Sequence, residues 1–316
     1  MIKVLVTGAA GFIGSHLTQR LVTLGYDVRA VDDLSTGSRE NLAGFVDRIE
    51  LFEADLADPE VCRAAVQDVQ FVFHEAAIPS VPRSIAEPSA THRANVDATF
   101  HLFEASRMAG VRRLIYAASS SVYGDTPELP KREQMPAQPR SPYALQKYFG
   151  ELYGRLYAEL FGLEVVSLRY FNVFGPRQDP NSEYSAVTSK FISMMLRGER
   201  PTIFGDGETS RDFTYVDNVV EANMLAMGAS PATGQCVNIG CGRAYSLNDL
   251  VAILNSILGT DLPPVYLPER EGDVRHSLAD IGLAGELLGY RPSVDFAEGL
   301  TRTVAATLAA PEPLVR

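Results

Sequence analysis

Hydrophobic positions in the first half of the chain fall into short apolar runs, and amphipathic segments of helical length separate them. The runs are rich in β-branched and aromatic side chains, which is typical of buried strands. They occupy residues 2–6, 28–31, 49–52, 71–73, 114–117 and 165–168. Strands that alternate with helices are joined by right-handed crossovers and form a parallel sheet covered by helices on both faces. The pattern therefore predicts an α/β fold built on a doubly wound parallel sheet.

The second half of the chain follows a different pattern, with longer loops after residue 172. Helices are predicted near residues 186–196, 247–258 and 296–308, which indicates a smaller C-terminal α/β lobe. The apolar run 236–239 is typical of another buried strand, so we expect the chain to return once to the first sheet. The predicted division is discontinuous: a first domain of residues 1–172 with a return segment at about 214–240, and a second lobe of residues 173–213 and 241–316.

The longest amphipathic segment runs from residue 142 to residue 161 and follows Ser141. Serine is a favoured N-cap and Pro142 is suited to the first helical position, so Tyr143 and Lys147 lie one turn apart on one face. A phenol has a pKa near ~10, and a lysine ammonium beside it favours the phenolate. Such a tyrosine can exchange a proton with a substrate hydroxyl. A Tyr-x-x-x-Lys pair also arises by chance on helix surfaces, so the other motifs decide its meaning.

A glycine-rich turn, with Gly8, Gly11 and Gly14, follows the first predicted strand and opens a helix. Glycines at such a turn let the backbone approach a pyrophosphate, whose charge the helix N-terminus favours. Asp32 ends the next predicted strand, where its carboxylate can accept hydrogen bonds from a ribose diol. Asp33 follows it without an adjacent arginine, and a carboxylate there would repel a 2′-phosphate. We therefore expect a dinucleotide site that prefers NAD to NADP.

Two further strand ends carry candidate cofactor contacts. Asp55-Leu56 closes the third predicted strand, and His74-Glu75-Ala76-Ala77 closes the fourth. Ligands of doubly wound sheets bind at the carboxyl ends of the strands. The small side chains of Ala76 and Ala77 would leave space there for the cofactor.

The composition is that of a globular protein with an acidic surface. The 316 residues are 46% hydrophobic and 21% charged, with a formal net charge of −11. This balance argues against general nucleic-acid binding and against binding to anionic membranes, so an anionic ligand would need a local basic pocket. Met1 leads directly into the first predicted strand, and no apolar run reaches membrane-spanning length. We therefore expect a cytoplasmic protein with no nucleic-acid or membrane partner.

The cysteines and histidines do not have the spacing of a metal site. Cys62, Cys236 and Cys241 are odd in number, widely separated and without a Cys-x-x-Cys pair, which argues against a disulfide framework. The five histidines also lack the spacing of metal ligands. We expect no metal.

Three motifs occur in order: the glycine turn at 8–14, Ser-Ser-Ser-Val-Tyr-Gly at 119–124 and the Tyr-x-x-x-Lys pair at 143–147. With them the chain resembles the extended short-chain dehydrogenase/reductases, and more narrowly the nucleotide-sugar 4-epimerases. Segments 169–177, 205–213 and 270–273 match family patterns too, so the resemblance covers essentially the whole length. It implies a Rossmann sheet that binds NAD and a smaller lobe that binds a UDP-sugar. It also implies a homodimer in which the helices at 96–108 and 142–161 form a four-helix bundle.

The resemblance also implies roles for individual residues. Tyr143 would be the acid/base, Lys147 would tune it and hold the nicotinamide ribose, and Ser119 would bond the sugar 4-oxygen, with Ser120 and Ser121 as rival hydroxyls. Expected cofactor contacts are Gly8, Gly11, Phe12, Ile13, Gly14, Asp32, Asp33, Ser35, Gly37, Asp55, Leu56, Ala76, Ala77, Asn95, Tyr143, Lys147, Tyr170 and Val173. Expected substrate contacts are Ser80, Arg83, Ser119, Tyr143, Asn172, Val187, Lys190, Phe204, Arg211, Arg270, Asp273 and Ser277.

Several activities of the family remain open. The 4,6-dehydratases usually carry Asp-Glu where this chain has Ser120 and Ser121, and the decarboxylases commonly carry glutamate at the second position. Ser277 stands where strictly UDP-glucose-specific relatives carry a bulky tyrosine, so we favour UDP-GlcNAc/UDP-GalNAc interconversion, with UDP-glucose as a secondary substrate. A UDP-glucose 4-epimerase remains an alternative. A UDP-glucuronate 4-epimerase is another, in which Arg83 would face the sugar carboxylate. A non-catalytic NAD-binding sensor is a further alternative.

Overall fold

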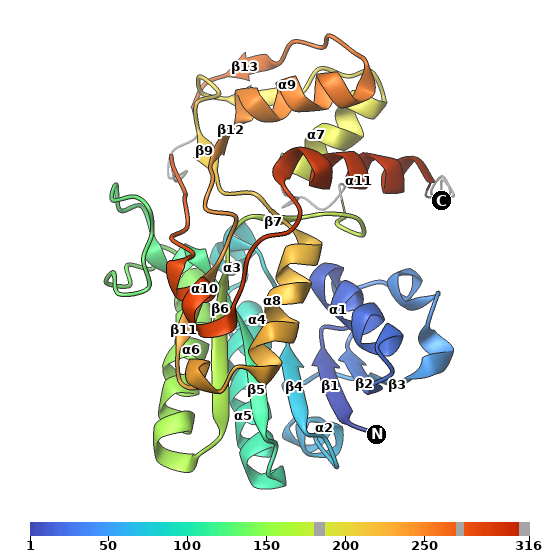
Figure 1. Cartoon of the computed structure of the whole chain (residues 1–316), viewed down its shortest axis with the longest axis vertical. Helices are drawn as coiled ribbons and strands as arrows, with labels where there is room; N and C mark the ends of the chain where they lie inside the picture. The colour runs from blue at the N-terminus through green and yellow to red at the C-terminus, as the bar shows by residue number, and fades with distance from the viewer. Residues whose placement is uncertain (180–186, 270–274, 310–316) are drawn as a thin grey trace.

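A seven-stranded parallel sheet forms the centre of the computed structural model, which describes residues 1–179, 187–269 and 275–309 (Figure 1). The strand order is β3-β2-β1-β4-β5-β6-β11. The strands are β1 (Lys3–Thr7), β2 (Asp27–Asp32), β3 (Ile49–Glu53), β4 (Phe71–His74), β5 (Arg113–Ser119), β6 (Glu164–Tyr170) and β11 (Cys236–Ile239). The sheet confirms the predicted doubly wound α/β fold.

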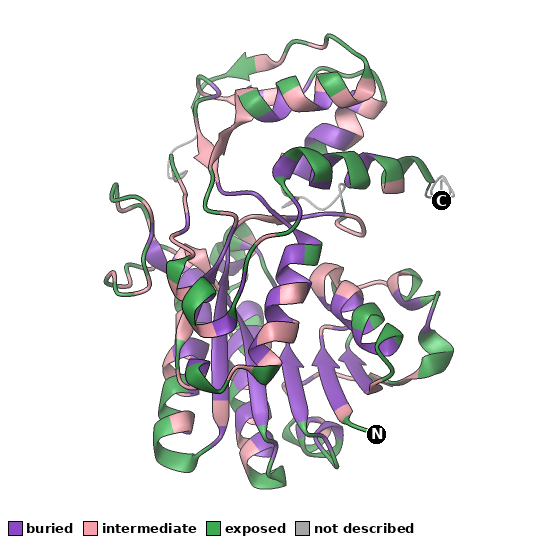
Figure 2. Cartoon of the chain, in the orientation of Figure 1, coloured by how far each residue is buried: buried purple, intermediate pink, exposed green. Residues whose placement is uncertain are grey.

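Helices cover both faces of this sheet and create two hydrophobic cores. Val4 and Val6 of β1 belong to one core and Leu5 to the other, because successive side chains of a strand point to opposite faces. Figure 2 shows the strands as buried along most of their length, except for the edge strand β3, whose residues are intermediate or exposed. The first layer contains α1 (Phe12–Thr23), α8 (Val216–Gly228) and α10 (Gly282–Leu288). The second contains α2 (Pro59–Ala65), α5 (Ala98–Ala109) and α6 (Pro142–Phe161).

The strand order reverses between β1 and β4, where ligands of doubly wound sheets bind. Thr7 ends β1 directly beside His74, which ends β4. Short helices follow β4, so the chain crosses this edge before it enters α5. They are α3 (Val81–Ala86), α4 (Pro88–His92) and the π-helical turn Arg93–Asp97. The 3₁₀ turns are Arg39–Leu42, Val46–Arg48, Ser120–Tyr123 and Ser230–Ala232.

A smaller group of elements lies at the carboxyl end of the sheet, at the top of Figure 1. Its helices are α7 (Val187–Leu196), α9 (Leu247–Leu258) and α11 (Phe296–Ala309). Its short strands are β7 (Val173–Phe174), β8 (Thr202–Phe204), β9 (Ser210–Arg211), β10 (Thr214–Tyr215), β12 (Tyr245–Ser246) and β13 (Val265–Leu267). They pair as β7 with β10, β8 with β13 and β9 with β12.

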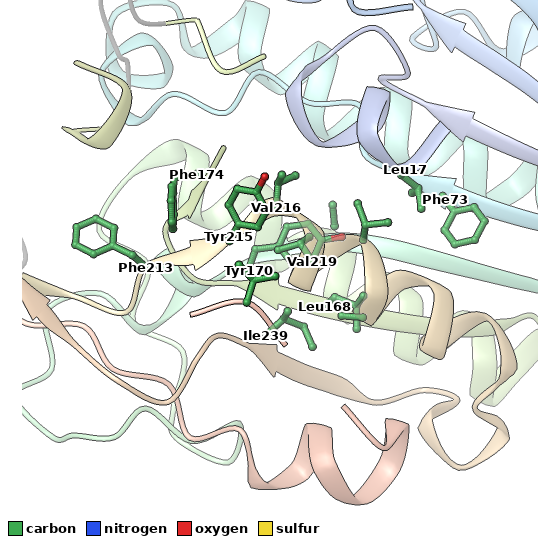
Figure 3. Close-up of a cluster of buried hydrophobic side chains, with 14 of the residues drawn as sticks. Leu17, Phe73, Leu168, Tyr170, Phe174, Phe213, Tyr215, Val216, Val219 and Ile239 are labelled. Atoms are coloured by element: carbon green, nitrogen blue, oxygen red, sulfur yellow. The ribbon is translucent and has the colours of Figure 1, made fainter. Parts of the chain in front are cut away.

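Aromatic side chains connect this group to the main sheet. Phe213 stacks on Phe296 of α11 with ring centroids 4.7 Å apart, and Phe174 meets Phe296 edge-on at 5.4 Å. Figure 3 shows Phe174, Phe213 and Tyr215 continuing a hydrophobic cluster that includes Phe73 of β4 and Leu17 of α1. The core of the sheet therefore extends into the smaller lobe.

The chain returns to the first sheet through β11, which pairs in parallel with β6 from Cys236 opposite Ser167 to Ile239 opposite Tyr170. The segment 173–213 is thus inserted between β6 and the helix α8 that leads back to the sheet. The exact boundaries of the two domains stay a prediction.

No helix in the described part of the chain has both the length and the apolar character needed to cross a membrane. Likewise, the described residues contain no group of three histidine, cysteine, aspartate or glutamate side chains placed to hold a metal ion.

Candidate active site

The glycine turn between β1 and α1 is fixed by close contacts of the backbone. Gly8 has a φ of +66° and donates its N–H to the Val31 carbonyl at 2.8 Å. A Cβ on Gly8 would lie 2.7 Å from the Ala76 nitrogen, and one on Gly14 would lie 2.0 Å from the Gly8 oxygen. Both contacts are too short for any side chain. Only glycine therefore fits these two positions, and the turn packs directly against Ala76.

Asp32 is placed at the end of β2 with both carboxylate oxygens directed by the backbone. Its Oδ2 accepts from the Ala10 N–H and its Oδ1 from the Leu34 N–H, each at 2.8 Å. Burial raises the pKa of this carboxyl, and the backbone hydrogen bonds oppose that rise. Each oxygen keeps a further lone pair, so the carboxylate can still accept hydrogen bonds from a ligand.

The loop after Asp32 is held against the glycine turn. Asp33 accepts from the backbone N–H of Ser35 at 2.9 Å and from its hydroxyl at 2.6 Å. The Ser38 N–H donates to the Ala10 carbonyl at 3.0 Å, which brings Gly37 against Ala10. The structure therefore places Asp33, Ser35 and Gly37 together beside the turn. Phe12 and Ile13, also expected there, form the first turn of α1 and are partly buried.

Asp55 does not end the third strand as expected, because β3 stops at Glu53. Asp55 instead accepts from the Ala57 N–H at 2.8 Å, a local side-chain-to-backbone bond that turns the chain toward Leu56. Its other oxygen pairs with Arg93. Burial raises the pKa of Asp55, but the Ala57 N–H and then Arg93 outweigh this effect, so the pKa is lowered.

Asn95 braces the segment that follows β4. Its Oδ1 accepts from the Ile78 N–H at 2.7 Å, and its Nδ2 donates to Gln146 Oε1 of α6 at 2.8 Å. Asn95 is almost fully buried. This bridge fixes the position of Ala76 and Ala77 relative to the helix that carries Tyr143.

His74 at the end of β4 is fully buried between two threonines. Its Nδ1 lies 2.8 Å from Thr7 Oγ1, and its Nε2 lies 2.9 Å from Thr99 Oγ1. The Thr99 hydroxyl donates its proton to the Asn95 carbonyl at 2.7 Å, so its oxygen must accept the hydrogen bond from His74 Nε2. His74 is therefore the neutral Nε2–H tautomer, with Nδ1 accepting from Thr7. Burial, assisted by the Lys147 charge, lowers its pKa to about 3.

Helix α6 begins at Pro142, one residue before Tyr143, in the way its sequence predicts. The Ser141 hydroxyl accepts from the Ala144 N–H at 3.2 Å and caps the helix. Tyr143 donates its backbone N–H to Ser84 Oγ at 3.1 Å, which fixes the helix start against α3. Burial raises the Tyr143 pKa, and a hydrogen bond with the Ser119 side chain opposes the rise.

Ser119 ends β5 and is oriented by Ser121. The Ser121 hydroxyl donates to Ser119 Oγ at 2.9 Å, and the Ser121 N–H donates to the same oxygen at 3.2 Å. Ser119 accepts both bonds, so its own proton is available for Tyr143 or a substrate oxygen. Of the three candidate hydroxyls, Ser119 is thus the one beside Tyr143, and Ser121 supports it.

Lys147 reaches across to the middle of the sheet. Its Nζ donates to the Ala117 carbonyl of β5 at 2.9 Å and lies 5.1 Å from the centre of the Tyr116 ring. Burial lowers the pKa of Lys147 to about 8, and the charges of Glu75 and Glu151 oppose this shift. Lys147 and Tyr143 are one helical turn apart on α6, as predicted.

Glu75 and Asn223 belong to this region, although no role was predicted for either residue. The Tyr170 hydroxyl donates to Glu75 Oε1 at 2.8 Å, and Asn223 Nδ2 of α8 donates to the Tyr170 oxygen at 2.8 Å. Burial raises the Glu75 pKa to about 7, against the effects of Tyr170 and Lys147. A carboxylate among small residues at a strand end was the one signal available for Glu75. The last expected cofactor contact, Val173, lies just beyond Tyr170 in β7.

In the smaller lobe, Arg211 and Ser277 lie on adjacent segments. The Ser277 N–H donates to the Ser210 carbonyl at 3.0 Å, next to Arg211 in β9. Arg211 Nη1 donates to the Ser210 and Arg275 carbonyls at 2.9 and 3.2 Å. Arg270 and Asp273 lie outside the described residues. Of the other expected substrate contacts, Phe204 ends β8, and α7 carries a partly buried Val187 and an exposed Lys190.

Asp212 ties this lobe to the sheet, a role that sequence reasoning missed. Its carboxylate is fully buried and accepts from the N–H groups of Cys241, Gly242 and Ala279 at 2.7, 2.9 and 3.1 Å. Asn172, an expected substrate contact with a φ of +33°, donates its Nδ2 to the Asp212 carbonyl at 3.3 Å.

Ser80 and Arg83 lie on α3, next to the start of α6. Ser80 Oγ accepts from the Arg83 N–H at 3.1 Å and so caps α3. Arg83 Nε pairs with Glu87 Oε2 at 3.1 Å, one turn further along. The Arg83 guanidinium thus already has a carboxylate partner.

Comparison with known proteins agrees with this geometry. Residues 4–240 match the NAD dependent epimerase/dehydratase family. The chain belongs to this family. It is therefore an NAD-dependent epimerase, with NAD as its cofactor, and the resemblance suggested by the motifs is confirmed.

Relatives in this family cover nearly the whole chain. A UDP-glucose 4-epimerase of Mycolicibacterium smegmatis is 41% identical over 96% of this chain and 97% of its own length. The structure of the Thermotoga maritima UDP-glucose 4-epimerase with UDP-glucose matches with a TM-score of 0.93 and 41% identity, covering 98% of this chain and 99% of that one. The UDP-N-acetylglucosamine 4-epimerase of Methanobrevibacter ruminantium M1, in complex with UDP-N-acetylmuramic acid, has a TM-score of 0.93 and 42% identity, covering 98% of each chain.

Proposed function

We propose that this member of the family is a UDP-sugar 4-epimerase that interconverts UDP-GlcNAc and UDP-GalNAc. The observation that carries the reaction type is the arrangement of Ser119, Tyr143 and Lys147 at the carboxyl edge of β5. Ser119 is hydrogen-bonded to the Tyr143 phenol, and the Lys147 ammonium lies one turn further along α6. A module that only bound the dinucleotide would have no use for a phenol held in this way.

The residues around the glycine turn fit NAD. The glycines at positions 8 and 14 allow the tight turn that brings the N-terminus of α1 to this edge of the sheet. The first N–H groups of α1, at Phe12 and Ile13, have no partner within the helix. Asp32 supplies carboxylate lone pairs for a ribose diol, and an acidic Asp33 beside it disfavours a 2′-phosphate. We assign the remaining expected cofactor contacts to the same edge: Gly11, Ser35, Gly37, Asp55, Leu56, Ala76, Ala77, Asn95, Tyr143, Lys147, Tyr170 and Val173.

The chemistry of this site is a proton transfer coupled to an oxidation at the sugar. When bound, NAD would accept the hydride from C4 and return it to the opposite face of C4. Tyr143, as phenolate, takes the proton of the 4-hydroxyl, and the sugar becomes a 4-keto sugar. Ser119 donates a hydrogen bond to the 4-oxygen and holds it next to Tyr143. After the sugar has turned over, Tyr143 returns the proton and the 4-epimer leaves. Lys147 favours the phenolate by its positive charge.

Arg211 is proposed to bind the diphosphate of the substrate. An arginine forms charge-assisted hydrogen bonds with phosphate oxygens, which an acidic protein needs locally for an anionic ligand. The carbonyls of Ser210 and Arg275 hold this guanidinium in place. The expectation extends to Asn172, Val187, Lys190, Phe204, Arg270 and Asp273 around the UDP moiety, and to Ser80 near the sugar.

Ser277 supports the choice of the N-acetylated sugar. Its backbone is fixed to Ser210, next to Arg211, so this position lies beside the proposed diphosphate site. A serine there occupies less volume than the tyrosine of strictly UDP-glucose-specific relatives, which would leave room for a 2-acetamido group. The relatives at 41–42% identity include both a UDP-glucose and a UDP-N-acetylglucosamine 4-epimerase, so identity alone does not favour one sugar.

UDP-glucuronate is the second candidate substrate, and Arg83 is the residue that suggests it. In the structure Arg83 already pairs with Glu87, so a sugar carboxylate would have to replace this partner. This weakens the case for UDP-glucuronate.

The experiment that tests the substrate uses proton NMR of the anomeric signals. The protein with NAD⁺ is incubated separately with UDP-GlcNAc, UDP-glucose and UDP-glucuronate. We expect UDP-GalNAc from the first, and Ser277→Tyr should lose this activity while retaining that on UDP-glucose. Ser277→Ala, which also has a small side chain, is the matched control and should behave as the wild type. Turnover of UDP-glucose alone would refute the choice of sugar, and the absence of all three epimers would refute the proposed substrates.

A homodimer through α5 and α6 remains part of the proposal. Large apolar side chains on these helices are exposed: Phe100 and Met108 on α5 and Leu156 and Leu160 on α6, the last at 68%. Pairing the two helices of each protomer would cover them in a four-helix bundle. Light scattering at micromolar concentration should give twice the mass of the chain, and a monomer would contradict this assembly.

A further inference from the structure

We propose that Glu75 is a positioning residue for the catalytic pair, whose carboxylate keeps Lys147 in its ammonium form while Tyr170 and Asn223 hold that carboxylate in place. The inference rests on the proposed role of Tyr143, because the Lys147 charge matters for catalysis only if Tyr143 ionises. The ionic interaction between Glu75 and Lys147 can be measured without any substrate.

The sheet places Glu75 just beyond the end of β4, beside the strand β5 to which the side chain of Lys147 from α6 is bound. His74 of β4 pairs with Tyr116 of β5, so Glu75 follows at the level of Ala117. The Ala117 carbonyl is the acceptor for Lys147 Nζ at 2.9 Å. Glu75 and Lys147 interact electrostatically across this short step. The register of β4 and β5 thus brings an acidic and a basic side chain together at the carboxyl edge of the sheet.

The hydrogen bonds identify Glu75 as an acceptor. Asn223 Nδ2 donates both to the Val219 carbonyl, at 2.9 Å, and to the Tyr170 oxygen, at 2.8 Å. The carbonyl can only accept, so the orientation of the Asn223 amide is fixed. The single Tyr170 proton is then directed to Glu75 Oε1 at 2.8 Å. The chain of donors from α8 through β6 ends on the Glu75 carboxyl group, and a hydrogen bond accepted there favours its ionised form.

The other charged and titratable groups near Lys147 do not replace Glu75. Glu151 is already bound by Arg169 at 3.0 and 2.7 Å, so its charge is compensated. His74 is neutral, and Tyr143 is the group to be activated. Tyr116 presents its ring face to Lys147 Nζ and donates its hydroxyl to the Lys147 carbonyl at 3.2 Å. Within the described residues, the group that donates a hydrogen bond to the Glu75 side chain is the neutral phenol of Tyr170.

The effect on Lys147 has a definite direction. Burial lowers the Lys147 pKa to about 8, and Glu75 is the larger of the two charges that oppose this fall. Removing the charge of Glu75 should therefore allow Lys147 to lose its proton at a lower pH. Tyr143 would then lose its positive neighbour near neutral pH, where the phenolate most needs it.

The composition makes a direct test practical, because the chain has only four lysines: Lys3, Lys131, Lys147 and Lys190. Protein labelled with ¹³C-lysine and saturated with NAD⁺ gives four side-chain signals, and Lys147→Met assigns the signal of interest. In Glu75→Gln the Lys147 titration should move to lower pH by about one unit, a tenfold change in its proton affinity, as expected for one nearby opposite charge. Glu75→Asp should recover part of the shift, and the exposed Glu60→Gln on α2 should cause none.

A second readout separates positioning from a structural role. In Glu75→Gln the alkaline limb of kcat should move to lower pH by the same amount as the Lys147 titration, with the other three lysine signals unchanged. An unchanged Lys147 titration would overturn the proposal, even if kcat falls. The lysine titration does not depend on the sugar, so its failure is distinct from failure of the proposed function.

Discussion

His74 predicts a specific loss of stability in mild acid. The ring is fully buried and uses both nitrogens, with Nδ1 accepting from Thr7 and Nε2 donating to Thr99. A proton on Nδ1 would place two donors against each other and a charge beside the Lys147 ammonium. In the native state the His74 ring therefore stays neutral down to about pH 3, where its pKa lies. In the unfolded chain the same ring takes up a proton near its ordinary pKa of 6.5.

The size of the effect follows from these two values. Between about pH 6.5 and 3 the unfolded state binds one more proton at this position, so stability falls as the pH falls. Lowering the pH from 7 to 5 should cost about 2 kcal/mol of unfolding free energy through His74 alone. For a protein with a total stability of roughly 5–15 kcal/mol, this is a measurable share.

Urea unfolding followed by far-ultraviolet circular dichroism at pH 7 and pH 5 measures this loss, since the chain has no tryptophan to report by fluorescence. The matched variant is His74→Asn, which keeps a donor and an acceptor but does not titrate. It should lose about 2 kcal/mol less than the wild type over this interval. His16, whose pKa is also lowered by burial, is present in both proteins, so its contribution cancels. Equal losses in the two proteins would refute the neutral, doubly bonded His74.

Two further substitutions test the site and the sheet that carries it. Tyr143→Phe removes the acid/base but keeps the backbone bond to Ser84, so kcat should fall by about 10²–10⁴-fold with an unchanged melting temperature; a kcat within tenfold of the wild type would contradict the role. Arg169→Met leaves the buried Glu151 carboxylate without its partner and should cost about 3–5 kcal/mol. Adding Glu151→Gln should restore much of that loss, and no restoration would show that the pair is not coupled.

Local signals in the sequence predicted α6 from its first to its last residue. Ser141 caps it, Pro142 occupies its first turn, and Gly162 ends it with a φ of +72°. The glycine turn and Asp32 were predicted for the same reason, because each depends on residues close together in the chain. β11 also matched its apolar run.

The contacts that complete the site were not predictable in this way. Glu75 lies 95 residues from Tyr170 and Asn223 lies 53 from it, so only the strand register brings them together. The short strands of the smaller lobe, such as β9 and β12, have two residues each, too few to show an alternating pattern. We predicted Asp55 at the end of a strand, because the apolar run does not indicate the turn that the Asp55 side chain stabilises.

The position of β11 at the edge of the sheet also affects how the chain is made. β6 ends at Tyr170, but its outer neighbour ends only at Ile239, about 70 residues later. At a translation rate of roughly 5–20 residues per second, the ribosome needs about 4–14 s to supply that neighbour. During this interval the nascent chain exposes an unpaired edge strand, which is prone to pair with other chains. The outer edge of β6 is therefore open to intermolecular pairing while the chain is being made and is covered by β11 in the finished fold.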